Sequence, residues 1–207
     1  MSRRSPSLVS TTNPWVTRST RAPRDEPQEQ TPDPLPALTG PATPQHGVAT
    51  PDETAMLPIA ARPVPGVPLW VLGAHGGSGE STLADLDDRW RAAGHWWPAP
   101  CPQASPTVLV TRTSSQGLMR ARAVLTQWAS RTVPHIELLG LVLMADAPGR
   151  LPRPLRDLSK LVAGGAPRTW SLPWVEAWRL GQAPALDDLP RQVRRLVKDL
   201  VSLTAPR

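Results

Sequence analysis

Phenylalanine and tyrosine are absent from this 207-residue chain, so nine tryptophans supply all of its aromatic side chains. Cys101 is the single cysteine, which excludes an internal disulfide framework and a cysteine-based zinc cluster. No apolar run reaches the roughly 18–20 residues of a membrane helix. The N-terminal stretch "MSRRSPSLVSTTNP" lacks the apolar segment of a signal peptide. We therefore expect a cytoplasmic protein without a membrane partner.

Acidic residues are missing from residues 89–136, and Lys160 and Lys198 are the only lysines, so arginine carries most of the positive charge. Acids and bases balance in residues 1–68, and the net charge of +6 therefore resides in residues 69–207. This excess of positive charge is compatible with contact with nucleic acid or an anionic membrane surface, and equally with a plain basic surface.

About half of the 27 prolines lie in residues 1–68, among threonine, serine and glutamine and without a helical or strand period. Proline fixes φ and removes backbone donors, and such a composition cannot bury enough apolar surface to offset the entropy of ordering. We therefore predict a disordered, proline-rich tail over residues 1–67. A protein partner would contact this tail or the surface of the following domain.

From residue 68 onward, short apolar stretches alternate with amphipathic ones. The short stretches predict strands, and apolar residues that recur every three or four positions predict helices. Their alternation predicts an α/β domain over residues 68–204, with an open parallel sheet of about four strands and helices on both faces. Strands are expected at 68–73, 107–112, 136–145 and 167–173, and helices at 79–94, 114–131, 153–165 and 186–203.

The stretch "LWVLGAHGGSGESTLADL", residues 69–86, places a glycine-rich turn between the first strand and its helix. In this arrangement backbone N–H groups converge on an anion. A phosphate-binding loop ends in Gly-Lys followed by Ser or Thr, whereas this turn ends in Gly79, Glu80 and Ser81. The alternative is a plain connection whose glycines serve only the backbone conformation.

"HGGSGEST" resembles the loop of the ParA/MinD-type ATPases, the P-loop proteins of partition and cell positioning, with His75 and Glu80 at the positions of the two lysines. "TVLVTRTSSQGLMRARAVL", "LLGLVLMADAP" and "RTWSLPWVEAWRLGQAP" resemble later segments of that family in the same order. The resemblance implies a truncated P-loop NTPase-like fold and a set of nucleotide contacts: Gly76, Gly77, Ser78, Gly79, Glu80, Ser81, Thr82 and Asp146.

The aspartates that bind Mg²⁺ in that family lie on strands for which this chain has only the loop 94–106, and Asp146 is the nearest substitute. A carboxylate about 4 Å from a phosphate charge is repelled by roughly 4 kcal/mol at an effective dielectric constant near 20. A glutamate in the first turn of a helix is, by contrast, stabilised by the helix dipole. We therefore predict that the Glu80 carboxylate occupies or guards the anion seat, the place where a phosphate would bind, and that the loop is stable without nucleotide.

These features favour a non-catalytic, degenerate P-loop protein, an accessory or adaptor in DNA partition, transfer or positioning, with no resident metal. One alternative is a variant ATPase that uses Ser81, Asp146 and an arginine such as Arg112 with ATP and Mg²⁺. Another is a purely structural interaction domain. The turn also resembles the His-Gly-Gly turn of α/β-hydrolase esterases, but the Gly-x-Ser-x-Gly elbow of those enzymes is missing. A homodimer is compatible with the resemblance.

The C-terminal helix carries a stripe of positive charge opposite its apolar residues. The stripe has the spacing i, i+3, i+4 and i+7 and consists of Arg191, Arg194, Arg195 and Lys198. Such a face binds DNA nonspecifically by neutralising phosphates, or is simply a solvated helix surface. Leu189, Val193, Leu196, Val197 and Leu200 are expected to face inward.

Overall fold

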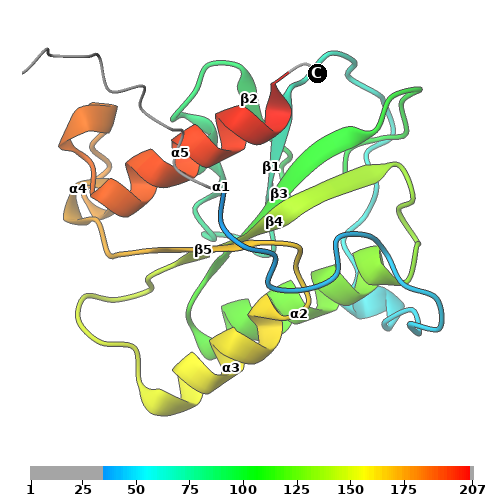
Figure 1. Ribbon diagram of the computed structural model, residues 1–207, viewed down its shortest axis with the longest axis horizontal. Helices are drawn as coiled ribbons and strands as arrows, with labels where there is room; N and C mark the ends of the chain where they lie inside the picture. The colour runs from blue at the N-terminus through cyan, green and yellow to red at the C-terminus, as the bar shows by residue number, and fades with distance from the viewer. Residues whose placement is uncertain (1–34, 206–207) are drawn as a thin grey trace, which may run out of the picture. The chain divides into compact units, whose positions relative to one another are not determined.

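A parallel β-sheet forms the centre of the computed structural model, which describes residues 35–205 (Figure 1). Within this range the sheet has five strands in the order β2-β1-β3-β4-β5, one of the two common orders of doubly wound sheets. The prediction of an α/β fold with a parallel sheet is confirmed, whereas the predicted number of about four strands is wrong. The strands are β1 (Leu69–Gly73), β2 (Trp90–Ala92), β3 (Ser105–Arg112), β4 (Ile136–Met144) and β5 (Thr169–Leu172).

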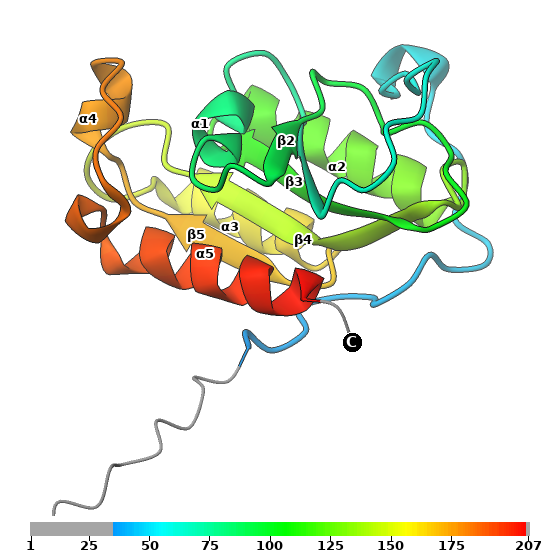
Figure 2. The same cartoon turned by 90° about the horizontal axis from the view of Figure 1, so that it is seen from above.

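Helices cover both faces of the sheet, as predicted. Two of them pack on one face and the C-terminal helix packs on the other, alongside β5 (Figure 2). No helix within residues 35–205 has the length and hydropathy needed to cross a bilayer. The helices are α1 (Glu80–Ala84), α2 (Ser115–Ala129), α3 (Arg153–Ala163), α4 (Glu176–Arg179) and α5 (Arg191–Thr204), with 3₁₀ turns η1 (Glu53–Ala55) and η2 (Leu186–Asp188).

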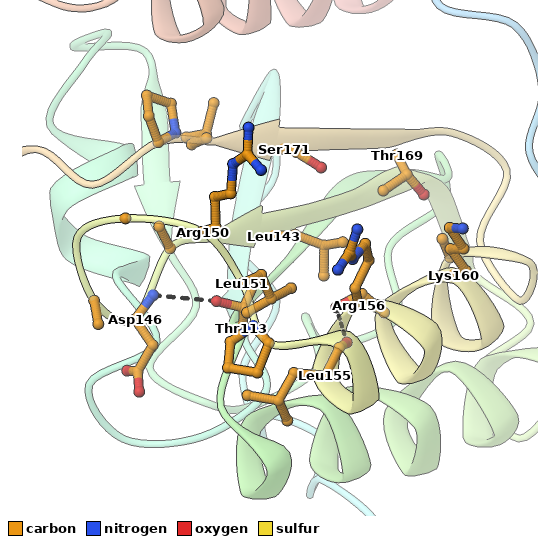
Figure 3. A pocket seen from close by; sticks show the side chains of 18 of the residues that line it. Thr113, Leu143, Asp146, Arg150, Leu151, Leu155, Arg156, Lys160, Thr169 and Ser171 are labelled. Carbon is orange, nitrogen blue, oxygen red and sulfur yellow. Dashed lines mark hydrogen bonds between the residues drawn. The ribbon is translucent and has the colours of Figure 1, made fainter.

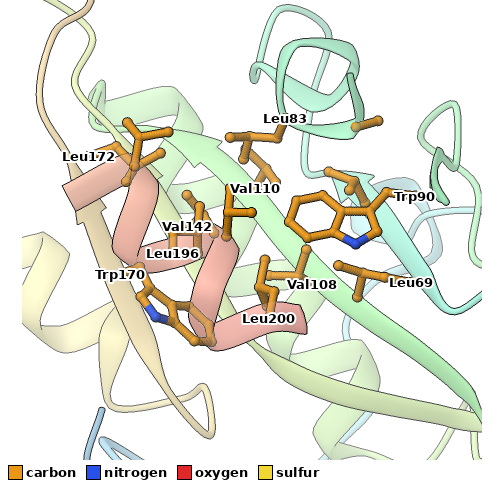
Figure 4. Close-up of a cluster of buried hydrophobic side chains, with 14 of the residues drawn as sticks. Leu69, Leu83, Trp90, Val108, Val110, Val142, Trp170, Leu172, Leu196 and Leu200 are labelled. Atoms are coloured by element: carbon orange, nitrogen blue, oxygen red, sulfur yellow. The ribbon is translucent and has the colours of Figure 1, made fainter. Parts of the chain in front are cut away.

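Alternate residues of the central strands enter two separate cores. Val108 and Val110 of β3 face α5, where they meet Leu196 (Figure 4). Leu109 lies between them in the sequence and faces α2 instead. Burying each such side chain contributes roughly 1.5–3 kcal/mol. All five residues predicted to face inward near the C-terminus are buried. Val193, Leu196, Val197 and Leu200 lie on α5, and Leu189 precedes its N-cap.

The predicted helix over residues 79–94 is wrong, because α1 ends at Ala84 and the chain then turns into β2. Asp87 makes this turn: one carboxylate oxygen accepts hydrogen bonds from the backbone N–H of Arg89 at 3.0 Å and from its Nε at 2.8 Å. The bonds from Arg89 lower the pKa of Asp87. Trp90 then pairs with Leu69 and is buried. The apolar residues that suggested one long helix are therefore divided among a short helix, a turn and a strand.

Residues 35–67 belong to the segment for which composition predicts disorder, yet they follow a defined path along the sheet domain. The backbone N–H of Thr39 donates to Pro167 O at 2.9 Å. Ile59 forms a parallel bridge with Trp97. Residues 1–34 of the predicted tail lie outside the described residues. The sheet domain is therefore flanked by an ordered segment that begins well before residue 68.

Candidate anion-binding site

The carboxyl ends of the parallel strands bring the glycine turn and Asp146 to the same edge of the sheet, as the sequence predicts. Open α/β sheets bind ligands at this edge, where neighbouring strands send their connections in opposite directions. A pocket of about 300 Å³ lies there. The glycine turn after β1, the end of β3 and the segments after β4 and β5 contribute to its lining, which consists of Gly77, Arg112, Asp146, Trp174, Val175, Trp178 and Arg179.

Arg112, the last residue of β3, is held in the pocket by two backbone carbonyls. Its Nε donates to Gly77 O at 3.3 Å and its Nη1 donates to Ala145 O at 3.0 Å. Burial lowers the pKa of Arg112, Asp146 acts in the opposite direction, and Arg179 lowers it further. A guanidinium stays protonated in proteins, so Arg112 is a fixed cation between the glycine turn and the end of β4.

His75 joins the glycine turn to the end of β3. Its Nδ1 lies 2.8 Å from Gly76 O, and its Nε2 lies 3.4 Å from the backbone N of Arg112. A neutral ring protonated at Nδ1 satisfies both contacts, because Nδ1 then donates and Nε2 accepts. The ring therefore positions the backbone around Arg112.

The prediction that the Glu80 carboxylate occupies the anion seat is wrong. The side chain is 6% exposed and turns away from the glycine turn. Its Oε1 accepts hydrogen bonds from the backbone N–H groups of Gly94 at 2.7 Å and His95 at 3.4 Å, and its Oε2 lies 3.0 Å from His95 Nδ1. The unpredicted strand β2 is the cause: it ends next to β1 and delivers Gly94 and His95, both in the left-handed region at φ 68° and 64°.

Three other residues of the glycine turn do not line the pocket. Ser78 is fully buried, and its Oγ has no hydrogen-bond partner in the described part of the chain. Gly79 has φ 99° and lies directly against the side chain of Met144, which leaves no room for a Cβ atom. Gly76 is exposed. The turn therefore needs glycine at position 79 for its backbone and its packing.

Of the predicted nucleotide contacts, only Gly77 and Asp146 line the pocket. The exposed Asp146 is oriented by a hydrogen bond from its backbone N–H to Thr113 Oγ1 at 3.1 Å. Ser81 is exposed and Thr82 half-buried on α1, and neither of them lines the pocket.

Sequence reasoning missed the pocket residues that follow β5: Trp174, Trp178 and Arg179. One signal in the sequence could have identified them: they follow a predicted strand, and residues just after the carboxyl end of a strand lie at the ligand-binding edge of the sheet. Trp174 is fixed by a hydrogen bond from its Nε1 to Glu176 Oε2 at 2.6 Å. Arg179 adds a second cation to the pocket.

The pocket is suited to holding an anion. It combines two guanidinium groups with one carboxylate, that of Asp146. Among residues 35–205 no three His, Cys, Asp or Glu side chains form a group that could hold a metal ion. Mg²⁺ in phosphate sites uses one or two carboxylates together with the phosphates of the substrate, so Asp146 would be its single ligand from this pocket.

The basic stripe lies on the exposed face of α5, as predicted. All four of its residues are exposed. Arg194 Nη1 donates to Asp187 O at 3.0 Å, and Arg195 Nε lies 3.9 Å from Asp199 Oδ2. Two of the four stripe residues therefore already interact with other groups of the same chain.

A family model described as "Family of unknown function (DUF6668)" matches residues 67–197. This span contains the whole sheet and every residue of the pocket. No curated protein matches the chain, and no solved structure matches it.

Proposed function

We propose that this chain, which belongs to the DUF6668 family of unknown function, is a non-catalytic protein that binds a phosphorylated ligand at the carboxyl edge of its sheet. The observation that carries the proposal is the position of Arg112, which is held between the glycine turn and β4 in a pocket that also contains Arg179. Arginine recognises phosphate through paired N–H donors.

The electrostatics of the pocket favour an anion. A phosphate oxygen about 4 Å from a guanidinium gains roughly 4 kcal/mol at an effective dielectric constant near 20. Arg112 is half-buried and already oriented, so little of this gain is lost in ordering its side chain. Trp174 and Trp178 line the same pocket as the two arginines, and stacking of a base on an indole ring contributes about 1–3 kcal/mol. A nucleotide fits both features.

In this proposal Arg112 supplies the charge that lysine supplies in a phosphate-binding loop, and the resemblance to ParA/MinD-type proteins supports a degenerate P-loop ancestry. An accessory or adaptor role in DNA partition, transfer or positioning follows from the same resemblance. A variant ATPase would use the same pocket and would release phosphate in the presence of Mg²⁺. A purely structural interaction domain would bind no nucleotide at all.

Arg112→Ala is expected to weaken nucleotide binding by about 10- to 100-fold, the usual effect of removing a charged hydrogen-bond partner. The measurement is a titration of the purified full chain with a fluorescent ATP analogue, with inorganic pyrophosphate as competitor. Arg122→Ala, which removes an exposed arginine outside this pocket, is the matched control and should leave affinity unchanged. Wild-type protein that binds neither the analogue nor pyrophosphate would refute the proposal, and Mg²⁺-dependent phosphate release would favour the ATPase.

DNA binding by α5 is a second candidate function, favoured by the exposure of the basic stripe. Charge reversal of Arg191 and Lys198 together is expected to weaken binding to duplex DNA and to reduce the slope of log K against log salt concentration by about 2. Electrophoretic mobility shifts over a series of salt concentrations measure both effects. Arg122→Glu is the control on α2. A wild-type chain that fails to retard duplex DNA at low salt removes this candidate.

A further inference from the structure

A groove of about 700 Å³ lies between α3 and β5 (Figure 3). Leu143 and Leu155 form part of its apolar floor, and the hydroxyl side chains of Thr169 and Ser171 line the side formed by β5. Asp146 contributes to this groove and to the anion-binding pocket, but the other residues of the groove are distinct from those of the pocket. The groove is thus a second concave surface, which shares only Asp146 with the anion-binding pocket.

The strand that borders this groove is the outer strand of the sheet, and only its start is contacted by the preceding segment, where Thr39 Oγ1 lies 3.2 Å from Thr169 Oγ1. In the described chain β5 pairs with β4 alone and is the last strand of the sheet. The carbonyl of Arg168, just before β5, accepts a hydrogen bond from Leu141 N–H at 2.8 Å, and that of Leu172 accepts one from Ala145 N–H at 3.0 Å. Because backbone groups alternate in direction along a strand, those of Thr169 and Ser171 point away from β4. An unpaired row of this kind is a template for a further strand.

Positive charge surrounds the same groove. Arg150, Arg156 and Lys160 line it and are exposed, and no ion pair involves any of them in the part of the chain that the structure describes. Asp146, at the end nearest the anion-binding pocket, is the one acidic residue in the lining. The charge of the groove therefore complements an acidic partner.

We propose that this groove binds an acidic, extended peptide segment of a partner protein, which adds to β5 as a sixth strand. The main chain of the segment would bond with the backbone groups of Thr169 and Ser171 that face away from β4, which supplies affinity independent of sequence. Alternate apolar side chains would enter the groove against Leu143 and Leu155. Acidic side chains would meet Arg156 and Lys160. Since β5 has four residues and rises about 3.3 Å for each, a segment of about six residues covers it.

A labelled hexapeptide of alternating glutamate and leucine with capped ends is the probe. The full chain is expected to bind it with a dissociation constant in the range of about 10–100 μM at low salt, measured by fluorescence anisotropy. Hydrogen exchange at the amides of Thr169 and Ser171 should slow by at least about tenfold when the peptide is bound. A peptide with lysine in place of glutamate should not bind. No detectable binding of the glutamate peptide at about 1 mM overturns the proposal.

Variants separate strand addition from adsorption to a charged surface. Arg156→Glu with Lys160→Glu is expected to weaken binding at least about tenfold, whereas Arg153→Glu, a control on the same helix outside the groove, should have little effect. Ser171→Pro removes an N–H group that faces away from β4, a position where proline is tolerated, and should also weaken binding about tenfold. Its thermal melting curve reports whether the fold is retained.

A peptide N-methylated at alternate residues tests the same main-chain bonds without any change to the protein. Its binding should be lost although its charge is unchanged. If the N-methylated peptide binds as well as the parent peptide, the segment does not add as a strand and the proposal is wrong. Arg112→Ala should leave peptide binding intact, so that failure of this proposal is distinguishable from failure of the phosphate-binding proposal.

Discussion

Gln127→Ala is expected to lower the free energy of unfolding by about 3 kcal/mol, because one buried side chain satisfies three polar groups. Gln127 Oε1 accepts hydrogen bonds from Leu57 N–H and Trp97 Nε1, and Gln127 Nε2 donates to Leu57 O, each at 2.9 Å. Trp97 is fully buried and Gln127 is 2% exposed. Truncation leaves these partners inside the protein without water to replace the amide.

Urea denaturation of wild-type and variant protein measures this loss. Gln116→Ala is the matched control, since Gln116 is an exposed glutamine on the same helix and should contribute within about 0.5 kcal/mol. Limited proteolysis adds a local measurement: residues 50–60 should be cleaved faster in Gln127→Ala, because Gln127 anchors this segment to α2. Equal stability of the two glutamine variants would show that residues 35–67 do not depend on that anchor.

Glu80→Lys is expected to lower the free energy of unfolding by about 3 kcal/mol and not to create a nucleotide-binding site. The substitution removes the acceptor for the backbone N–H groups of Gly94 and His95 and places an ammonium among these donors. A buried charge without a partner is strongly unfavourable. The fluorescent ATP analogue should therefore bind Glu80→Lys no better than wild type, after correction for the folded fraction.

Two comparisons isolate the cause of this effect. Glu80→Gln keeps a carbonyl oxygen for Gly94 N–H and should lose less stability than Glu80→Lys. Glu53→Lys makes the same change of charge at an exposed position and should be nearly neutral. A stable Glu80→Lys variant that gains tight nucleotide binding would contradict the structural role of Glu80 and restore the hypothesis of an anion seat closed by its carboxylate.

The strands and long helices could be predicted because their signals are local. An apolar run rich in β-branched residues marks β3, and a leucine-rich apolar run marks β4. Ser114 marks the start of α2, where its side chain accepts a hydrogen bond from Gly117 N–H at 3.2 Å. The stretch containing α1 and β2 could not be divided in this way. Its apolar spacing fits one helix, and the turn at Asp87 depends on a side chain that bonds with Arg89.

The candidate site could be predicted only where it depends on strand ends. Asp146 follows β4, so its place at the edge of the glycine turn follows from parallel pairing alone. The direction of the Glu80 side chain could not be deduced, because it depends on Gly94 and His95, which β2 delivers from further along the chain. The path of residues 35–67 depends likewise on Gln127, which is far away in the sequence. Amino-acid composition cannot predict such a contact.

The strand order has a consequence for how the chain folds during synthesis. When residues up to 92 have left the ribosome, β1 can pair only with β2, and the paired segment is three residues long. Two short strands alone are unstable in water. The stable neighbour of β1 is β3, which begins at Ser105, and β3 in turn forms its longest pairing with β4. The glycine turn therefore acquires its shape late, only after the middle of the polypeptide has been made.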